Sequence, residues 1–190
     1  RDRQSDEMRK VLNRKFFKQP TLRISRELLG KYLVRKFGRR TVAGIITEVE
    51  VYDGLRDKAS HAHRGKTKRN FVMFGPAGVW YVYFTYGMHW LLNIACGKEG
   101  YPAAILIRSV LFKGIYPELA CGEPVEPVEG PARVTKFFKI NGSFNNKKAD
   151  KKTGLWLEDR GVKIKRFQIH RAPRVGVAYA GTYWANKPYR

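Results

Sequence analysis

The amino-acid sequence predicts an α/β (α+β) chain, a single domain over residues 1–190 that is built on a curved, mostly antiparallel β-sheet with flanking helices. The 190 residues, 43% of them hydrophobic, suffice to bury a core but are few for two domains. Short strand-like segments outnumber helical ones. Nothing in their order indicates a Rossmann or (β/α)8-barrel layout, in which strands alternate with helices.

The first part of the chain supplies one helix and the longest predicted strand. Residues 1–20 form a basic N-terminal segment, and residues 22–32 are typical of a helix that leads into a strand. Apolar and polar residues alternate over residues 41–52, a pattern that predicts a strand. The polar, basic stretch 53–70 is long for a connection, and long loops in compact domains are often functional.

Three further strands are expected in the centre of the chain. Residues 78–87 are rich in aromatic side chains, residues 88–96 continue as an apolar strand, and residues 103–111 form the next one. Residues 117–130 contain four Glu and several Pro but no Lys or Arg. We therefore expect a mobile loop there, which a polyanion would repel.

The C-terminal part is expected to return to β structure. Residues 131–140 resemble a short helix with Pro131 in its first turn, where a missing N–H is tolerated. Residues 145–152 form a lysine-rich loop. Two or three further strands are predicted between residues 155 and 180.

The charge balance points to an anionic partner. Lys and Arg number 38 against 16 Asp and Glu, a formal net charge of +22, and such a field attracts polyanions. Bases stack on aromatic rings, which make up 13% of the residues, so nucleic acid is favoured over an anionic membrane or an acidic protein. We find no transmembrane segment and no signal peptide, and we expect an intracellular, DNA-associated protein.

Cysteine and histidine usage indicates neither a disulfide framework nor a metal site. Cys96 and Cys121 lie 25 positions apart, outside any CxxC pattern, and are expected to be reduced thiols. His61 and His63 have no Cys, His or Asp cluster to complete a metal site, so a polar loop role is expected. The sequence therefore predicts no metal and no other cofactor.

The central stretch holds the residue types needed to remove a base from a nucleic acid. Glu48 and Glu50, two apart on one strand, point the same way, and a carboxylate there could activate water and stabilise an oxocarbenium-like transition state. Flat side chains that could sandwich a base are Tyr52, His61, Tyr81, Tyr83 and Tyr86. Residue types alone leave another interpretation open, in which the glutamates face solvent, the tyrosines belong to the core and the chain only binds nucleic acid.

Several motifs follow one another along the chain: EVEVYDG (48–54), SHAHRG (60–65), RN (69–70), MFGPAGVWYVYFTYGMHWLLNI (73–94), ILIR (105–108), EGPARV (129–134) and RVGVAYAG (174–181). In this order they resemble the alkyladenine (3-methyladenine) DNA glycosylase family, of the mammalian methylpurine type, over residues 20–190. The most specific is Glu-x-Glu-x-Tyr followed by Tyr-Val-Tyr-x-x-Tyr-Gly-Met. The resemblance implies a monofunctional, monomeric enzyme that hydrolyses the glycosidic bond of damaged purines in double-stranded DNA and leaves an abasic site.

The resemblance also assigns the chemistry and the base pocket. It implies that Glu50 is the general base that activates water and that Arg108 lies near that water. Tyr52, His61 and Tyr83 would stack the flipped base. Aromatic faces would attract a cationic alkylated base by cation–π interaction.

The remaining assignments concern selectivity and DNA contact. Asn93, at the pocket floor, would obstruct the 2-amino group of normal guanine. Tyr86 would enter the minor groove and take the place of the flipped base, with Met88 beside it. Thr67 and Arg69 would contact DNA.

Two alternatives remain. A bifunctional glycosylase and lyase would use a Lys as a Schiff-base nucleophile, and a nonenzymatic nucleic-acid-binding module would keep the fold without the activity. Val51 stands where many family members have Ala, and His89 where the residue is often aromatic. The spacings between residues 61 and 69 and between 93 and 108 also differ from the expected ones, which leaves the loop geometry around the pocket open.

Overall fold

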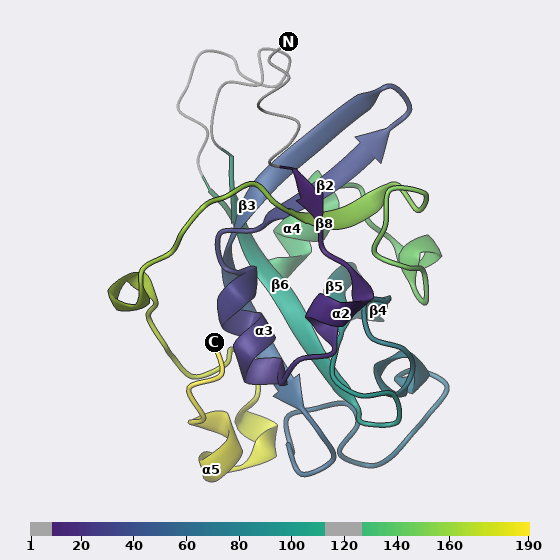
Figure 1. Cartoon of the computed structure of the whole chain (residues 1–190). Helices are drawn as coiled ribbons and strands as arrows, with labels where there is room; N and C mark the ends of the chain where they lie inside the picture. The colour runs from purple at the N-terminus through teal and green to yellow at the C-terminus, as the bar shows by residue number, and fades with distance from the viewer. Residues whose placement is uncertain (1–8, 113–126) are drawn as a thin grey trace.

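The computed structural model describes residues 9–112 and 127–190 (Figure 1). Within these ranges, eight strands form one antiparallel sheet in the order β1-β8-β2-β3-β6-β5-β4, and β7 also pairs with β6. The strands are β1 (Lys10–Val11), β2 (Tyr32–Phe37), β3 (Arg40–Asp53), β4 (Trp80–Thr85), β5 (His89–Ala95), β6 (Ala103–Leu111), β7 (Val128–Glu129) and β8 (Leu155–Asp159). The predicted α/β class with a curved antiparallel sheet is confirmed.

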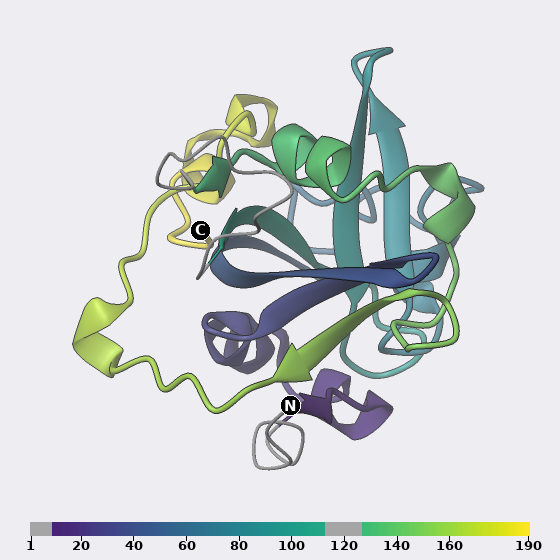
Figure 2. The same cartoon turned by 90° about the horizontal axis from the view of Figure 1, so that it is seen from above.

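Short helices flank this sheet. They are α2 (Arg14–Phe17), α3 (Thr21–Leu28), α4 (Pro131–Phe137) and α5 (Thr182–Ala185). Seen from above, α3 and α4 lie on opposite sides of the central strands (Figure 2). α3 buries Ile24 and Leu28, four residues apart on one helix face, and α4 buries Val134 in the same core. No helix in the described ranges is both long enough and apolar enough to cross a membrane.

β3 is the strand that positions the candidate site. It lies between β2 and β6, and its pairing with β6 shifts register on both sides of Glu48, which is the signature of a β-bulge. Residues 43–46 and 49–51 are buried without alternation because other elements cover both faces of the strand. Glu50 is consequently fully buried, so the alternative of a solvent-facing strand glutamate is wrong for this residue.

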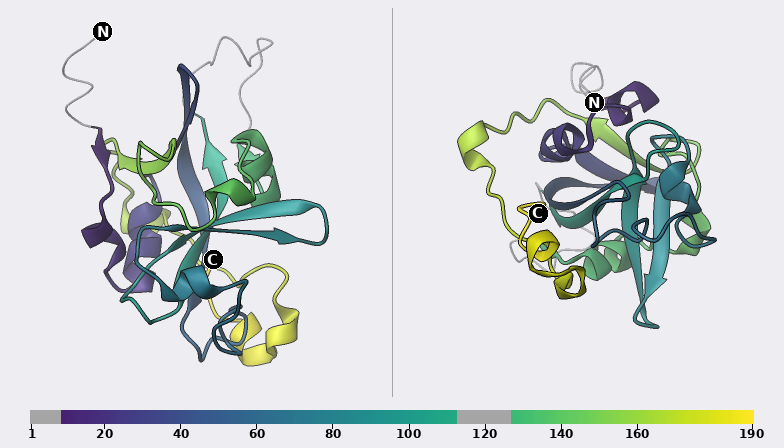
Figure 3. Two further views of the ribbon diagram at one scale, coloured as in Figure 1. Left: turned by 90° about the vertical axis from the view of Figure 1, so that its right-hand side faces the viewer. Right: turned by 90° about the horizontal axis from the view of Figure 1, so that it is seen from below.

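β4 and β5 form a hairpin that projects beyond the body of the molecule (Figure 3). Its turn has positive φ at Tyr86 (52°) and at Gly87 (66°), and the Met88 N–H closes it on the Thr85 carbonyl at 3.1 Å. Positive φ is uncommon for a bulky residue such as tyrosine. Strain of this kind is often found at functional positions.

Residues 54–70 contain turns but neither helix nor strand, as the sequence predicts. The predicted helix at residues 131–140 is present as α4, and the predicted strand at 103–111 is β6. The expected mobile loop at 117–130 falls mostly outside the described residues. Its described end is not a loop, because Val128 and Glu129 form β7 against Val110 and Ser109.

The prediction of two or three strands between residues 155 and 180 is wrong, since this stretch contains one, β8. Residues 160–173 follow as an exposed, strongly basic connection with one short 3-10 turn, Arg166–Gln168. β8 already pairs on both sides, with β1 and β2, so a following strand has no neighbouring partner there. The chain instead returns to β3, where the Val51 N–H donates to the Tyr189 carbonyl at 2.8 Å.

Candidate active site

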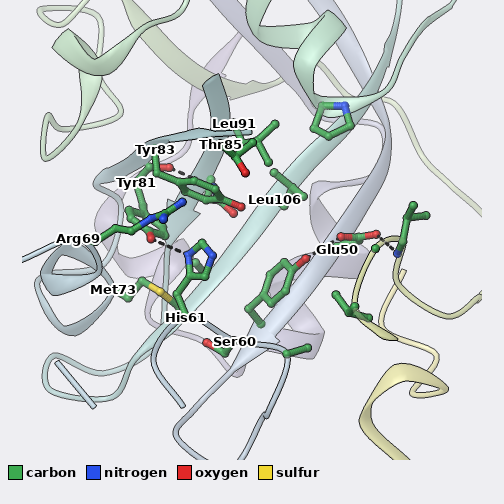
Figure 4. Close-up of a pocket in the computed structure, with 18 of the residues that line it drawn as sticks. Glu50, Ser60, His61, Arg69, Met73, Tyr81, Tyr83, Thr85, Leu91 and Leu106 are labelled. Carbon is green, nitrogen blue, oxygen red and sulfur yellow. Dashed lines mark hydrogen bonds between the residues drawn. The ribbon is translucent and has the colours of Figure 1, made fainter. Parts of the chain in front are cut away.

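One pocket collects most of the residues singled out in the sequence (Figure 4). Its volume of about 820 Å³ is within the range that accommodates drug-sized ligands and therefore a nucleotide. The walls come from β3, β4, β5, β6, the turns at residues 58–64 and the segment 175–179. Glu50 lies at one end of the pocket, and His61, Tyr81, Tyr83 and Arg69 lie at the other.

Three groups bind the buried carboxylate of Glu50. The Val175 N–H donates to Oε1 at 2.8 Å, and Arg108 Nη1 lies 3.2 Å from the same oxygen. The Tyr52 hydroxyl donates to Oε2 at 2.9 Å. Because hydrogen bonds to a charged acceptor are strong, these donors stabilise a negative charge that lacks contact with bulk water.

Arg108 joins Glu50 to its neighbour Glu48. Its Nε donates to Glu48 Oε1 at 3.1 Å, and Arg190 Nη1 reaches the same oxygen at 2.9 Å. The acidic side chains of β3, Glu50 and Glu48, thus alternate with the basic side chains of Arg108 on β6 and Arg190 in the C-terminal segment. This arrangement fixes the guanidinium of Arg108 beside the Glu50 carboxylate.

Aromatic rings form the other end of the pocket. The centroids of His61 and Tyr83 are 4.6 Å apart, those of Tyr81 and Tyr83 are 5.2 Å apart, and His61 Nδ1 hydrogen-bonds with the Tyr81 hydroxyl at 2.9 Å. Burial raises the pKa of Tyr52, Tyr81 and Tyr83 above the ordinary tyrosine value, and Glu50 raises that of Tyr52 further. The hydroxyls therefore remain protonated at neutral pH and can donate hydrogen bonds.

His61 is uncharged at neutral pH. Its side chain is open to the pocket but enclosed by protein on other sides, and burial, followed by the positive charge of Arg69, lowers its pKa to about 4. Its main chain is held by Asn70, whose Nδ2 donates to the His61 carbonyl at 2.8 Å. The imidazole is thus neutral, and its backbone is held in place.

The tyrosine rings already contact arginines. The guanidinium of Arg69 lies 5.1 Å from the Tyr83 ring centroid and donates to the Phe84 carbonyl at 3.0 Å. The guanidinium of Arg174 lies 5.0 Å from the Tyr52 centroid. A guanidinium group thus lies beside the ring of each of these two tyrosines.

Comparison with known proteins identifies the family. The family model for methylpurine-DNA glycosylase (MPG) matches residues 15–190. The chain belongs to this family. It is 40% identical over 197 residues to a candidate 3-methyladenine DNA glycosylase of Methanocella arvoryzae, covering 95% of this chain and 90% of the relative. Candidates of the same name in Legionella pneumophila strain Paris (38% over 187 residues, 96% and 93% covered) and Myxococcus xanthus (39% over 181 residues, 92% and 86%) are similar.

The resemblance drawn from the motifs is therefore confirmed, and so is the expected enzyme class, a DNA glycosylase. The structure of this methylpurine-DNA glycosylase family member brings Glu50, Arg108, Tyr52, His61 and Tyr83 around one pocket. Their individual roles stay predictions.

Asn93 is one of the residues that line the pocket, on strand β5. It is buried, and its Nδ2 donates to the Tyr81 carbonyl at 3.2 Å. On β5 it stands opposite Tyr81 of β4 and Leu106 of β6. The hydrogen bond to Tyr81 fixes the orientation of the Asn93 amide.

Three of the predicted DNA contacts lie on the surface. Tyr86 and Met88, at the hairpin tip, are 81% and 67% exposed. Thr67 is also exposed, and it caps its own loop: its N–H donates to Asn70 Oδ1 at 2.7 Å, and its hydroxyl accepts from the Asn70 N–H at 3.3 Å. Arg69 is exposed as well, but its guanidinium turns toward the pocket and lies over Tyr83.

Sequence reasoning missed several residues that build the pocket. Val175 supplies the backbone donor to Glu50, and Arg174 beside it forms a fully buried ion pair with Asp57. The motif RVGVAYAG contains Val175 and Arg174. A hydrogen bond donated by a backbone N–H, however, leaves no recognisable pattern in the sequence. Within the described residues, no group of three or more His, Cys, Asp and Glu side chains could hold a metal ion.

Proposed function

We propose that this glycosylase flips alkylated or deaminated purines out of duplex DNA and hydrolyses their N-glycosidic bond, leaving an abasic site. The proposed lesions are 3-methyladenine, 7-methylguanine, hypoxanthine and ethenoadenine. One observation carries the proposal: the fully buried carboxylate of Glu50 faces a wall of aromatic rings across a nucleotide-sized pocket. The names of the relatives, candidate 3-methyladenine DNA glycosylases, support the choice of substrate.

The chemistry follows from the surroundings of Glu50. Each carboxylate oxygen has two lone pairs, and Oε2 receives the Tyr52 hydroxyl, which leaves one acceptor position for a water molecule. Glu50 would take a proton from this water molecule while the water oxygen forms a bond to C1′ of the sugar. The C1′–N bond breaks with its electron pair leaving on the base, and the nearby carboxylate stabilises the oxocarbenium-like sugar.

The base would stack between Tyr52 on one side and His61 and Tyr83 on the other, and Asn93 would limit its exocyclic groups. Tyr86 would fill the gap left in the duplex, because its ring is exposed at the end of a projecting hairpin. Met88 lies beside it on the same tip. Flipping is cheaper for a damaged pair, so selectivity would begin before the base enters the pocket.

Phosphate contacts would come from the basic loop before β4 and from the hairpin side of the molecule. Thr67 and Arg69 belong to this loop, and Lys58 and Arg64 also line the pocket. Such contacts fix the position of a protein on the duplex and make its affinity fall with salt.

The decisive experiment compares base release and DNA binding in the native protein and in Glu50→Gln. Duplexes carrying each of the four lesions are incubated with excess protein, and abasic sites are read after alkali. We expect the native protein to release base, and Glu50→Gln to bind the same DNA with release at least about a hundredfold slower. Glu27→Gln, which removes an exposed carboxylate paired with Arg23, is the matched control and should behave as native.

Two other results would change the proposal. Release of base by Glu50→Gln at the native rate would remove Glu50 from the mechanism, and DNA binding without release by the native protein would indicate a binding module. Lys58 is the lysine among the described pocket residues, so a lyase step would fall to it. We expect borohydride to trap no covalent adduct with DNA, and an adduct lost in Lys58→Ala would establish a bifunctional enzyme.

A further inference from the structure

The pocket carries an excess of positive charge. Of the described residues that line it, Glu50 has the one carboxylate, whereas Lys58, Arg64, Arg69 and Arg108 are cationic. The three histidines on the lining do not offset this excess, since histidine is either neutral or positive. A flipped base therefore enters a space whose net charge is positive.

Two of the arginines near the stacking rings have their charges balanced. Arg108 contacts both Glu48 and Glu50. Arg174, which lies over Tyr52, forms two short contacts with Asp57, at 2.6 and 2.8 Å. Their fields are largely cancelled at the distance of a bound base.

Arg69 differs from these two arginines. Its contacts within the described part of the chain are with neutral groups, the Phe84 carbonyl, the Tyr83 ring and the Tyr81 hydroxyl. It lies over Tyr83 at the end of the pocket away from Glu50 (Figure 4). Its charge is also felt by His61, whose pKa it lowers in addition to the effect of burial. The electrons of the Tyr83 ring are thus already attracted to one cation.

The proposed lesions fall into two charge classes. Methylation at N7 of guanine or N3 of adenine gives a nucleoside with a positively charged ring, which becomes neutral only when the glycosidic bond breaks. Hypoxanthine and ethenoadenine are neutral throughout. Aromatic faces alone would favour the cationic class, but a guanidinium close to the same ring opposes it.

We propose that Arg69 makes this pocket favour neutral damaged purines, such as hypoxanthine and ethenoadenine, over ring-methylated cationic purines. The inference rests on the proposed function, and it makes Arg69 a specificity-determining residue. A cationic base on Tyr83 would lie within about 10 Å of the guanidinium, where repulsion at an effective dielectric constant near 20 weakens binding roughly tenfold. Neutral bases escape this penalty.

The test must separate pocket preference from the reactivity of the lesion, because cationic purines also leave DNA faster without enzyme. Single-turnover release of hypoxanthine and of 7-methylguanine is measured with saturating protein. Each rate is divided by the spontaneous rate of the same oligonucleotide. The ratio of the two accelerations, hypoxanthine over 7-methylguanine, reports the preference and is insensitive to a general loss of DNA affinity.

We expect Arg69→Gln to lower this ratio about tenfold, and Arg69→Lys, which keeps the charge, to leave it near the native value. Arg64→Gln is the matched control, since Arg64 is an exposed arginine on the same pocket. Its loss should affect both lesions alike. Competition binding with 2′-fluoro analogues of the two nucleotides, which resist hydrolysis, should show the same change in ratio.

The failure of this inference is distinguishable from failure of the proposed function. If the native protein excises both lesions but Arg69→Gln leaves the ratio unchanged, or shifts it no more than Arg64→Gln does, Arg69 does not set the preference. If the native protein excises neither lesion, the proposed function fails and the inference fails with it.

Discussion

Arg174 and Asp57 form a two-pronged ion pair between side chains that are both 0% exposed, with Nη1 2.6 Å from Oδ2 and Nη2 2.8 Å from Oδ1. Asp57 also accepts the Ala59 N–H at 3.1 Å, and Arg174 donates to the carbonyls of Val51 at 2.7 Å and Trp184 at 3.2 Å. The pair fastens the C-terminal segment to β3 and to the loop after it. It thereby holds the Val175 N–H against Glu50.

Breaking this pair should destabilise the whole protein. Asp57→Asn leaves the buried guanidinium without its counter-charge, and we expect the free energy of unfolding to fall by about 3–5 kcal/mol in urea titrations. Arg174→Lys should also be costly because an ammonium cannot reproduce the paired geometry. The exposed pair Arg23–Glu27 is the control, and Glu27→Gln should cost less than about 1 kcal/mol. Equal costs for Asp57→Asn and Glu27→Gln would contradict this account.

Tyr52 is expected to contribute in two separable ways, through its hydroxyl on Glu50 and through its ring. Tyr52→Phe removes the hydrogen bond to Oε2 and keeps the ring, so single-turnover base release should slow by roughly ten- to a hundredfold while affinity for lesion DNA stays near native. Tyr52→Ala should lose affinity as well, because stacking is lost. Release by Tyr52→Phe at the native rate would show that the hydroxyl has no part in the reaction.

Tyr86 should contribute to activity at the expense of hairpin stability. Asn tolerates the left-handed backbone conformation, so Tyr86→Asn, at φ 52°, is expected to preserve or raise the melting temperature. Release of hypoxanthine from duplex DNA should fall sharply, since nothing would fill the gap in the stack. Release from single-stranded DNA, where no pair is broken, should fall much less. A fall of equal size on both substrates would rule out a role in base flipping.

The neutral state of His61 should be visible in pH titrations. The folded-state pKa of about 4 is below the value of about 6.5 in an unfolded chain, so the unfolded state binds a proton first as the pH falls. The stability due to neutral His61 is therefore fully present above pH ~6.5 and is lost progressively as the pH falls toward 4. NMR should show His61 titrating near pH 4 and, in Arg69→Gln, at higher pH. Titration near 6.5 in the native protein would contradict this.

Much of the fold was predictable because local patterns dominate it. Alternation marked β3, aromatic and apolar runs marked β4 and β5, and a proline marked the first turn of α4. The same patterns failed after β8. Between residues 160 and 180 strand-like residues are present, but strands need partners, and both sides of β8 are already paired.

The sequence predicted which residues line the pocket, but it did not predict the burial and the charged contacts of these residues. The motifs placed Glu50, Tyr52 and Tyr83 together, yet the full burial of Glu50 depends on elements that cover both faces of β3. The contact between Arg69 and Tyr83 depends on the path of the loop at residues 54–70, which Asn70 fixes through the carbonyls of His61 and Gly65. Such contacts arise from tertiary structure and have no signature in residue order.

The backbone donor to Glu50 comes from Val175, 125 positions later in the chain. A ribosome releases the N-terminal part first, so β3 and its carboxylate emerge long before the segment that completes their surroundings. A nascent chain would already present basic residues to nucleic acid while its excision centre was still unassembled. The surroundings of Glu50 are therefore completed late in synthesis, when the segment that contains Val175 packs against β3.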